Sequence, residues 1–247
     1  KDIKTVYVDE VQDRIYVGAH AGGMMVLHRK SGYIEYYNRH NSNLPSNNIY
    51  SIISDGYGGL WVASLEYLLH FDIDKRNFTI VDVDGDGHKL QQYNRLLFCD
   101  SKKRIWAGGE MGISVFNQVG TSLLPNTDFQ IASVLKQAFV NCFYETSSGY
   151  LWIGTRNGLF ALKESDKQFL QYTTENGLPS NVIYGILEDS YGRLWISTNQ
   201  GLSCLNSESG KFRNFTIMDG LQGNQFNAGA YCRKDNGYML FGGVNGI

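Results

Sequence analysis

The apolar residues of this chain fall into short runs that recur at a regular interval. Each repeat contains a stretch of five residues with a large side chain near its start, as in LWIGT at 151–155 and LWIST at 194–198. Aligning the six copies on this large residue, the register residue, gives Tyr16, Trp61, Trp106, Trp152, Trp195 and Leu240. They are spaced 45, 45, 46, 43 and 45 residues apart. Self-similarity at this period is typical of propeller blades, each a four-stranded sheet. The pattern therefore predicts an all-β fold, a β-propeller.

The fifth repeat shows the sequence pattern of one blade. Residues 182–187 form an apolar run rich in β-branched side chains, which suits a strand buried on both faces. Further strands are predicted at 193–197 and 202–205, and residues 212–216 alternate apolar and polar, as a half-exposed outer strand does. Turns that contain glycine separate these strands. One repeat is thus one four-stranded antiparallel blade.

Counted this way, residues 1–247 form one propeller segment with five complete blades and the first half of a sixth. An open ring of blades leaves a bare sheet edge, so we expect both ends to be truncated and the intact propeller to have seven blades. Residues 121–137 do not follow the repeat, which predicts an irregular outer strand in the third blade, with a contact to another domain as the alternative.

The shared register of the tryptophans predicts their role. A large side chain on the second strand of every blade faces the neighbouring blade, so we expect it to pack in the core. A platform for stacking sugars is the alternative interpretation of the same residues.

Composition excludes several classes of protein. The formal net charge is −2, from 22 basic and 24 acidic residues that are well mixed, so nucleic acid is not an expected partner. No apolar run approaches the ~20 residues of a membrane span. The four cysteines lie at unrelated positions of their repeats, without metal-ligand spacing, and are predicted to be free and mostly buried thiols.

Several motifs together resemble a known family. Residues 177–181 read GLPSN, residues 189–198 read DSYGRLWIST, and similar lettering occurs at 43–47 and 148–159. This combination resembles the two-component regulator propeller repeat. The resemblance implies the periplasmic sensor region of a hybrid two-component histidine kinase of the Bacteroidetes type. Such a receptor senses an oligosaccharide and controls polysaccharide-utilisation genes. It also implies a homodimer, held in the inner membrane by a transmembrane segment outside this chain.

The loops at one end of the blades are the expected ligand-binding face, because rigid strands position variable loops there. Planar hydrogen-bonding groups and aromatic faces suit a glycan, and arginine suits a carboxylate or sulfate. The candidate residues at the start of the first strands are Tyr50, Arg95, Asn141 and Tyr184. The candidates in the turns between second and third strands are Glu66, Tyr67, Arg156, Asn199 and Gln200.

An acidic loop raises the question of calcium. Asp82, Asp84 and Asp86, followed by Gly87, match the start of a calcium-binding loop, but position 12 holds Tyr93 where the pattern needs glutamate. We therefore expect no cofactor, with a weak calcium site at these aspartates as the alternative.

No catalytic motif stands out, and we expect this segment not to be an enzyme. Two other functions stay open. His20, Glu66 and Glu110 lie in turns of different blades and could meet as the acid–base groups of a glycan lyase or hydrolase. A scaffold that binds only protein is the third class.

Overall fold

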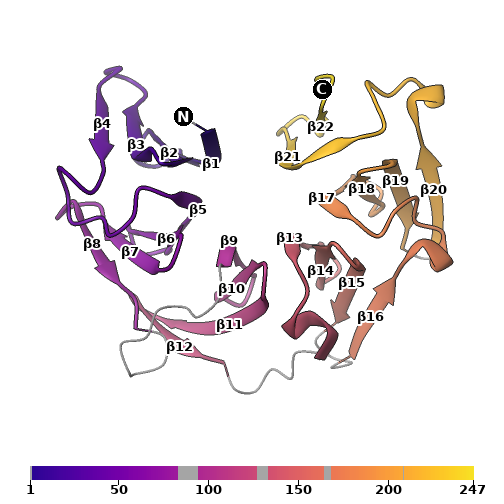
Figure 1. The fold of residues 1–247 in the computed structure, drawn as a ribbon, viewed down its shortest axis with the longest axis horizontal. Coiled ribbons are helices and arrows are strands. Elements are labelled where there is room, and N and C mark those ends of the chain that lie inside the picture. The colour runs from indigo at the N-terminus through magenta and orange to yellow at the C-terminus, as the bar shows by residue number, and fades with distance from the viewer. Residues whose placement is uncertain (1, 83–93, 127–132, 164–167, 208) are drawn as a thin grey trace. The chain divides into compact units, whose positions relative to one another are not determined.

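The protein is described by a computed structural model that covers residues 2–82, 94–126, 133–163, 168–207 and 209–247 (Figure 1). These residues form 22 strands and short 3-10 helices. The strands make five four-stranded antiparallel sheets and one two-stranded sheet, each from consecutive strands. The predicted class, an all-β propeller built from four-stranded blades, is confirmed.

The first three sheets are named in chain order. The first contains β1 (Asp2–Asp9), β2 (Arg14–His20), β3 (Gly23–His28) and β4 (Ile34–Tyr37). The second contains β5 (Ile49–Ser54), β6 (Leu60–Ser64), β7 (Leu68–Asp72) and β8 (Asn77–Ile80). The third contains β9 (Asn94–Cys99), β10 (Arg104–Gly109), β11 (Gly112–Val119) and β12 (Ser122–Pro125).

The other three sheets follow the same plan. The fourth contains β13 (Val140–Glu145), β14 (Tyr150–Thr155), β15 (Gly158–Lys163) and β16 (Gln168–Tyr172). The fifth contains β17 (Ile183–Glu188), β18 (Leu194–Thr198), β19 (Gly201–Asn206) and β20 (Lys211–Phe215), and the sixth β21 (Phe226–Arg233) and β22 (Met239–Gly243). The 3-10 helices are η1 (Ser133–Lys136), η3 (Thr174–Asn176) and η4 (Ile217–Asp219).

The chain divides into two compact units, Lys1–Ile131 with the first three sheets and Ala132–Ile247 with the others. In each unit the core lies between successive sheets. Tyr16 of the first sheet packs in one cluster with Ile49 of the second, and Trp152 of the fourth packs with Ile183 of the fifth. Hydrophobic burial between neighbouring blades thus holds each unit together.

The register residues occupy this core as predicted, with two exceptions. Tyr16, Trp61 and Trp106 are fully buried and Trp152 is 4% exposed. Trp195 and Leu240 are only half-buried. The sheet that follows Trp195 has two strands among the described residues, so it covers less of the ring, which instead stacks on Phe215 of its own sheet with ring centroids 5.4 Å apart.

Close packing between sheets requires a small residue two positions after the register residue. A Cβ atom at Gly18 would lie 2.5 Å from Ile49, and one at Gly154 would lie 2.7 Å from Ile183. No real Cβ approaches a carbon so closely, so any larger side chain would push the neighbouring sheet away.

An asparagine stands at the same position of three crossovers, in NLPSN at 43–47, GLPSN at 177–181 and GLQGN at 220–224, and its hydrogen bonds explain why it recurs. The backbone carbonyls of Asn47, Asn181 and Asn224 accept hydrogen bonds from the N–H groups of Gly23, Gly158 and Gly201, at 2.8, 2.8 and 2.6 Å. Their side-chain oxygens accept a second bond from the crossover itself, as Asn181 does from the N–H of Thr174 at 2.9 Å. Each asparagine therefore ties the crossover between two blades to the hairpin of the preceding blade.

One prediction about the outer strands was wrong. Residues 122–125 form the regular strand β12, which pairs with β11 from Phe116↔Pro125 to Val119↔Ser122. Its sequence did not alternate clearly, but backbone pairing does not depend on side-chain identity. Leu135 of η1, downstream of this strand, is fully buried, as Leu44 and Leu178 of the GLPSN motifs nearly are.

The four cysteines are free thiols, as predicted. Cys142 and Cys204 are buried, Cys99 is half-buried and Cys232 is exposed. Burial raises the pKa of the Cys142 thiol to about 12, so it stays protonated and unreactive at neutral pH.

Candidate ligand-binding site

A β-bulge recurs near the start of the first strand in the first five sheets. In the second sheet Ile49 pairs with Ser64 and Ser51 with Ala63, so Tyr50 is left without a partner across the ladder. The bulged residues of the five sheets are Lys4, Tyr50, Arg95, Asn141 and Tyr184. A bulge redirects its side chain away from the regular alternation and bends the strand. Four of these five residues are predicted ligand-binding residues, and Lys4 was not predicted.

In the first unit the bulges bring side chains of three sheets together. The guanidinium carbon of Arg95 lies 4.9 Å from the ring centroid of Tyr50. Arg95 Nη2 lies 2.8 Å from Glu110 Oε1, in the turn after β10. The rings of Tyr50 and His20 have centroids 6.5 Å apart. The sequence places His20 and Glu110 in the turns of the same expected face and makes them the acid–base groups of the enzyme alternative; here they extend the pair of Tyr50 and Arg95.

Arg95 is incompletely satisfied in this cluster. Its Nε atom is buried and donates no hydrogen bond to any described residue, although the side chain as a whole is 40% exposed. Glu110 is 34% exposed, so solvent screens the ion pair and its net contribution to stability is small. The cluster therefore offers a planar cation, a carboxylate and an aromatic face to a molecule outside.

In the second unit the predicted residues have structural partners. The Nδ2 atom of Asn141 donates to the backbone carbonyl of Ile183 at 2.7 Å, which links the fourth sheet to the fifth. Tyr184 is half-buried against the cluster that contains Leu187 and Phe226. These two bulged residues join sheets to each other, and the structure does not group them into a binding cluster.

The turn residues of the second unit are more accessible. The guanidinium carbon of Arg156 lies 3.7 Å from the ring centroid of Phe139, and the side chain is exposed. The Oδ1 atom of Asn199 is buried and accepts no hydrogen bond. Gln200 is exposed, and its backbone N–H donates to Thr198 Oγ1 at 3.0 Å, which fixes the turn. Arg156 and Asn199 thus remain candidates, in separate turns.

Glu66 and Tyr67 lie in the turn between β6 and β7. Glu66 is exposed, while Tyr67 is half-buried against the core of the first two sheets. The carbonyl of Tyr67 accepts a hydrogen bond from the backbone N–H of Ser64 at 2.9 Å. Tyr67 therefore shapes the turn, and Glu66 is the member of the pair that points to solvent.

The calcium prediction falls largely outside the described residues. Asp84 and Asp86 are not described, and Asp82 is exposed just after the second sheet. Among the described residues, no three histidine, cysteine, aspartate or glutamate side chains form a group that could hold a metal ion. The calcium site remains a prediction.

A comparison with protein families now decides what the repeats are. The model of the two-component regulator propeller matches residues 43–66, 135–157 and 177–200. Three segments of the chain therefore match the two-component regulator propeller repeat. Each regulator repeat runs from a buried leucine, through the bulge and the register tryptophan, to the turn that bears the candidate residues. The resemblance drawn from the GLPSN and LWIGT lettering is thereby confirmed.

Solved structures share the fold of these regulator repeats at low sequence identity. The extracellular domain of BT3049 from B. thetaiotaomicron, described as a hybrid two component system, is 21% identical with a TM-score of 0.72. That of BT4673, described in the same words and from the same organism, is 18% identical with a TM-score of 0.76. PorZ, a surface component of the type-IX secretion system of Porphyromonas gingivalis, is 16% identical with a TM-score of 0.75.

The matched parts differ in extent. The alignments cover 100, 99 and 99% of this chain, but only 38, 32 and 38% of the three solved chains. At these identities the likeness establishes the propeller fold and leaves function to the site. No curated protein matches the chain. Within the described residues, no helix combines the length and the apolar character that crossing a membrane requires.

Proposed function

We propose that this chain is the ligand-binding part of an extracytoplasmic, specifically periplasmic, sensor of a hybrid two-component system, and that its ligand is an oligosaccharide. The three regulator repeats support the sensor role. The two structures from B. thetaiotaomicron, whose names describe extracellular domains of such systems, add support at the level of the fold. Histidine kinase activity, dimerisation and the control of polysaccharide-utilisation genes are proposed for the full-length receptor.

The observation that carries the carbohydrate part is the cluster of Tyr50, Arg95 and Glu110. A sugar presents hydroxyl groups that both donate and accept, together with faces of C–H groups. Glu110 can accept from hydroxyls, Arg95 can donate to hydroxyl or carboxylate oxygens, and the Tyr50 ring can cover a C–H face. The buried Nε of Arg95, which lacks an acceptor, is the feature that a ligand oxygen would complete.

The same cluster argues for binding without catalysis. Glycoside hydrolysis commonly uses two carboxyl groups that flank the scissile bond. Glu110 instead faces the guanidinium of Arg95 at 2.8 Å, an arrangement suited to recognition. The lyase or hydrolase alternative and the protein-binding scaffold are kept as outcomes of the experiment below.

Isothermal titration of the full sensor region, with neutral and acidic oligosaccharides and with and without calcium, tests this function. Saturable heat with one glycan and no new reducing ends is the expected result. Arg95→Ala should weaken that binding about tenfold or more, because a hydrogen bond to a charged group contributes about 1.5–3 kcal/mol. Its thermal midpoint should stay close to that of the wild type, since the ion pair is half-exposed.

Arg213→Ala is the matched control. Arg213 is an exposed arginine that also covers an aromatic ring, at 4.8 Å from the centroid of Phe215, but it lies on the outer strand β20. The Arg213→Ala variant should bind the glycan with the affinity of the wild type. Equal affinity of Arg95→Ala and wild type would remove the cluster from the site. The absence of binding heat with every glycan of the panel would favour the protein-binding scaffold. New reducing ends would favour the hydrolase.

A further inference from the structure

The register tryptophans differ in how their indole N–H groups are satisfied. A buried indole N–H normally finds an acceptor. Trp106 Nε1 donates to Asp100 Oδ2 at 2.8 Å, and Trp195 Nε1 donates to Asp189 Oδ2 at 3.0 Å. Trp61 Nε1 donates to Gln118 Oε1 at 3.2 Å. In these three sheets the protein itself supplies the acceptor.

The fourth sheet does not supply one. Trp152 is 4% exposed, and its buried Nε1 atom has no hydrogen-bond partner among the residues that the structure describes. Thr146 stands at the position that Asp100 and Asp189 occupy in their repeats, six residues before the tryptophan. Its hydroxyl accepts from the backbone N–H of Tyr150 at 3.1 Å and lies 3.0 Å from Ser148 Oγ. The threonine is thus engaged with its own turn and leaves the indole unpaired.

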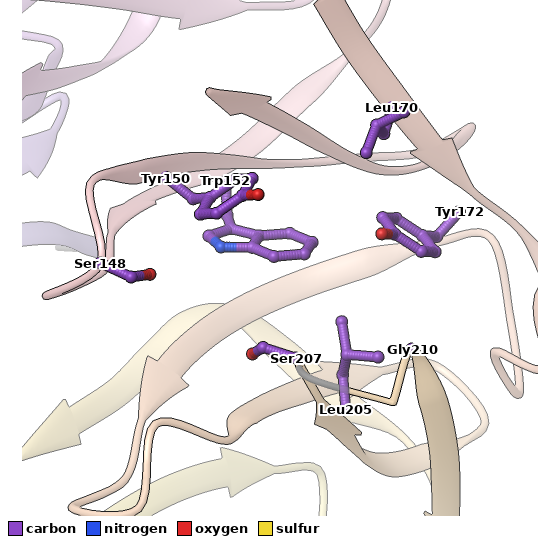
Figure 2. A pocket seen from close by; sticks show the side chains of 8 residues that line it. All are labelled: Ser148, Tyr150, Trp152, Leu170, Tyr172, Leu205, Ser207 and Gly210. Carbon is purple, nitrogen blue, oxygen red and sulfur yellow. The ribbon is translucent and has the colours of Figure 1, made fainter. Parts of the chain in front are cut away.

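A pocket lies at this tryptophan, between the fourth and fifth sheets (Figure 2). Its volume is about 80 Å³. The rings of Tyr150 and Tyr172 flank Trp152, with centroids 6.2 and 5.8 Å from the indole, and Leu205 lies across the pocket. A single buried water needs only about 10–15 Å³. One water molecule therefore does not fill the space beside the indole.

The polarity of the residues that line the pocket determines which ligand groups it can bind. The residues that line the pocket are Ser148, Tyr150, Trp152, Leu170, Tyr172, Leu205, Ser207 and Gly210. None of these described lining residues carries a charge, and the nearby Lys163 Nζ lies 5.4 Å from the ring centroid of Tyr150. A neutral ligand group suits this lining, because an ionised group would lose its hydration there. The indole is a donor only, so the ligand must bring an acceptor. Leu170 and Leu205 present apolar surface to whatever flanks that acceptor.

We propose that this pocket binds the acetamido group of an N-acetylated sugar. The neutral carbonyl oxygen accepts from Trp152 Nε1, and the methyl group lies against the leucines. The sugar ring stays at the mouth, where Tyr172 is half-buried and Leu170 is 50% exposed. Burial raises the pKa of Tyr172, so its hydroxyl is neutral and adds a donor or acceptor at the rim. The site is separate from Arg95 and does not depend on the function proposed above.

Nuclear magnetic resonance of the ¹⁵N-labelled chain tests the proposal directly. The chain has four tryptophans, and Trp152→Phe identifies the Trp152 indole signal by its loss. N-acetylglucosamine should shift this signal saturably, while glucose, which lacks the acetamido group, should not. Acetamide alone separates the two sources of this chemistry. A shift at comparable concentration would point to small amides, and a much weaker effect would point to the sugar.

Two variants and a control complete the test. Thr146→Asp provides the internal acceptor that Asp100 and Asp189 supply in the third and fifth sheets, and should weaken N-acetylglucosamine binding about tenfold or more. Leu170→Asp places a charge at the exposed rim and should also weaken it, so the test survives if Thr146→Asp fails to fold. Trp195→Phe removes an indole that is already bonded and should leave the shift intact. A Trp152 signal that no acetamido compound moves would overturn the proposal and leave a water-filled pocket.

Discussion

The fourth and fifth sheets each have a tryptophan at the register position, but the two tryptophans differ in the burial of the ring and in the pairing of the indole N–H. Trp152 buries its ring almost completely and leaves its N–H unpaired, whereas Trp195 is half-exposed and donates to Asp189. In the fifth sheet Arg193 Nε also donates to Asp189, at 2.7 Å, and Tyr150 stands at the corresponding position of the fourth. Burial of the ring and pairing of its N–H are therefore separate properties. The repeat fixes where the ring lies, the neighbouring sheet decides how far it is buried, and individual residues decide whether its N–H is paired.

Truncating the two tryptophans gives the largest expected difference. Trp152→Ala should lower the free energy of unfolding by about 3–5 kcal/mol, the usual cost of removing a buried aromatic side chain. Trp195→Ala should cost clearly less, because its ring is half-exposed and packs partly on Phe215. Urea unfolding of both variants measures this. Equal losses would show that burial does not distinguish the two sheets.

Replacing the residue six positions before each tryptophan should give the next largest difference in the free energy of unfolding. Asp189→Ala leaves the indole N–H of Trp195 and the Arg193 guanidinium without their carboxylate, and should cost about 1–3 kcal/mol. Thr146→Ala removes the hydrogen bonds that its hydroxyl makes within its own turn, to Tyr150 and Ser148, and should cost about 0.5–1.5 kcal/mol. The same urea titrations apply. A larger loss for Thr146→Ala would mean that its hydroxyl supports more than its turn.

Transferring the aspartate and arginine should convert one sheet into the other. The double variant Thr146→Asp with Tyr150→Arg reproduces the arrangement of Asp189 and Arg193, and should raise the free energy of unfolding by about 1 kcal/mol. Thermal unfolding, with Thr146→Asp alone as the reference, reports the change. A lower midpoint in the double variant would show that the fourth sheet cannot accommodate the pair.

Acid should remove the stability that ionised Asp189 contributes to the fifth sheet, an effect smaller than those of the substitutions above. Burial raises the pKa of Asp189, but hydrogen bonds from Trp195 and Arg193 lower it more, so the net pKa lies below the ordinary 3.8. A depressed pKa contributes stability that is present above the ordinary value and lost as pH falls through the lower one. The gap in thermal midpoint between wild type and Asp189→Asn should thus be constant at neutral pH and shrink below 3.8. A gap that persists in strong acid would contradict this assignment.

The sequence predicted what depends on period and composition. The first strand expected at 182–187 is Ile183–Glu188, and the registered large residues mark the cores between sheets. It did not predict that Gln118 accepts from Trp61, because these residues lie in different repeats and their contact depends on how two sheets pack. It also did not predict that Glu110 pairs with Arg95 across the third sheet. Asn141 was chosen for its polarity, but the bulge turns it toward a backbone carbonyl. Strand periodicity carries no signal for that redirection.

The hydrogen bonds by which asparagines join the crossovers to the hairpins have a consequence for protein engineering. Asn181 and Asn224 hold the hairpins through backbone N–H groups of Gly158 and Gly201, and the side chains at the neighbouring turn positions take no part in those two bonds. A combinatorial library that varies 156, 157, 199 and 200 while it keeps these glycines and asparagines therefore leaves the ties in place. The second unit is in this sense a scaffold on which new binding loops can be selected without redesigning the blades.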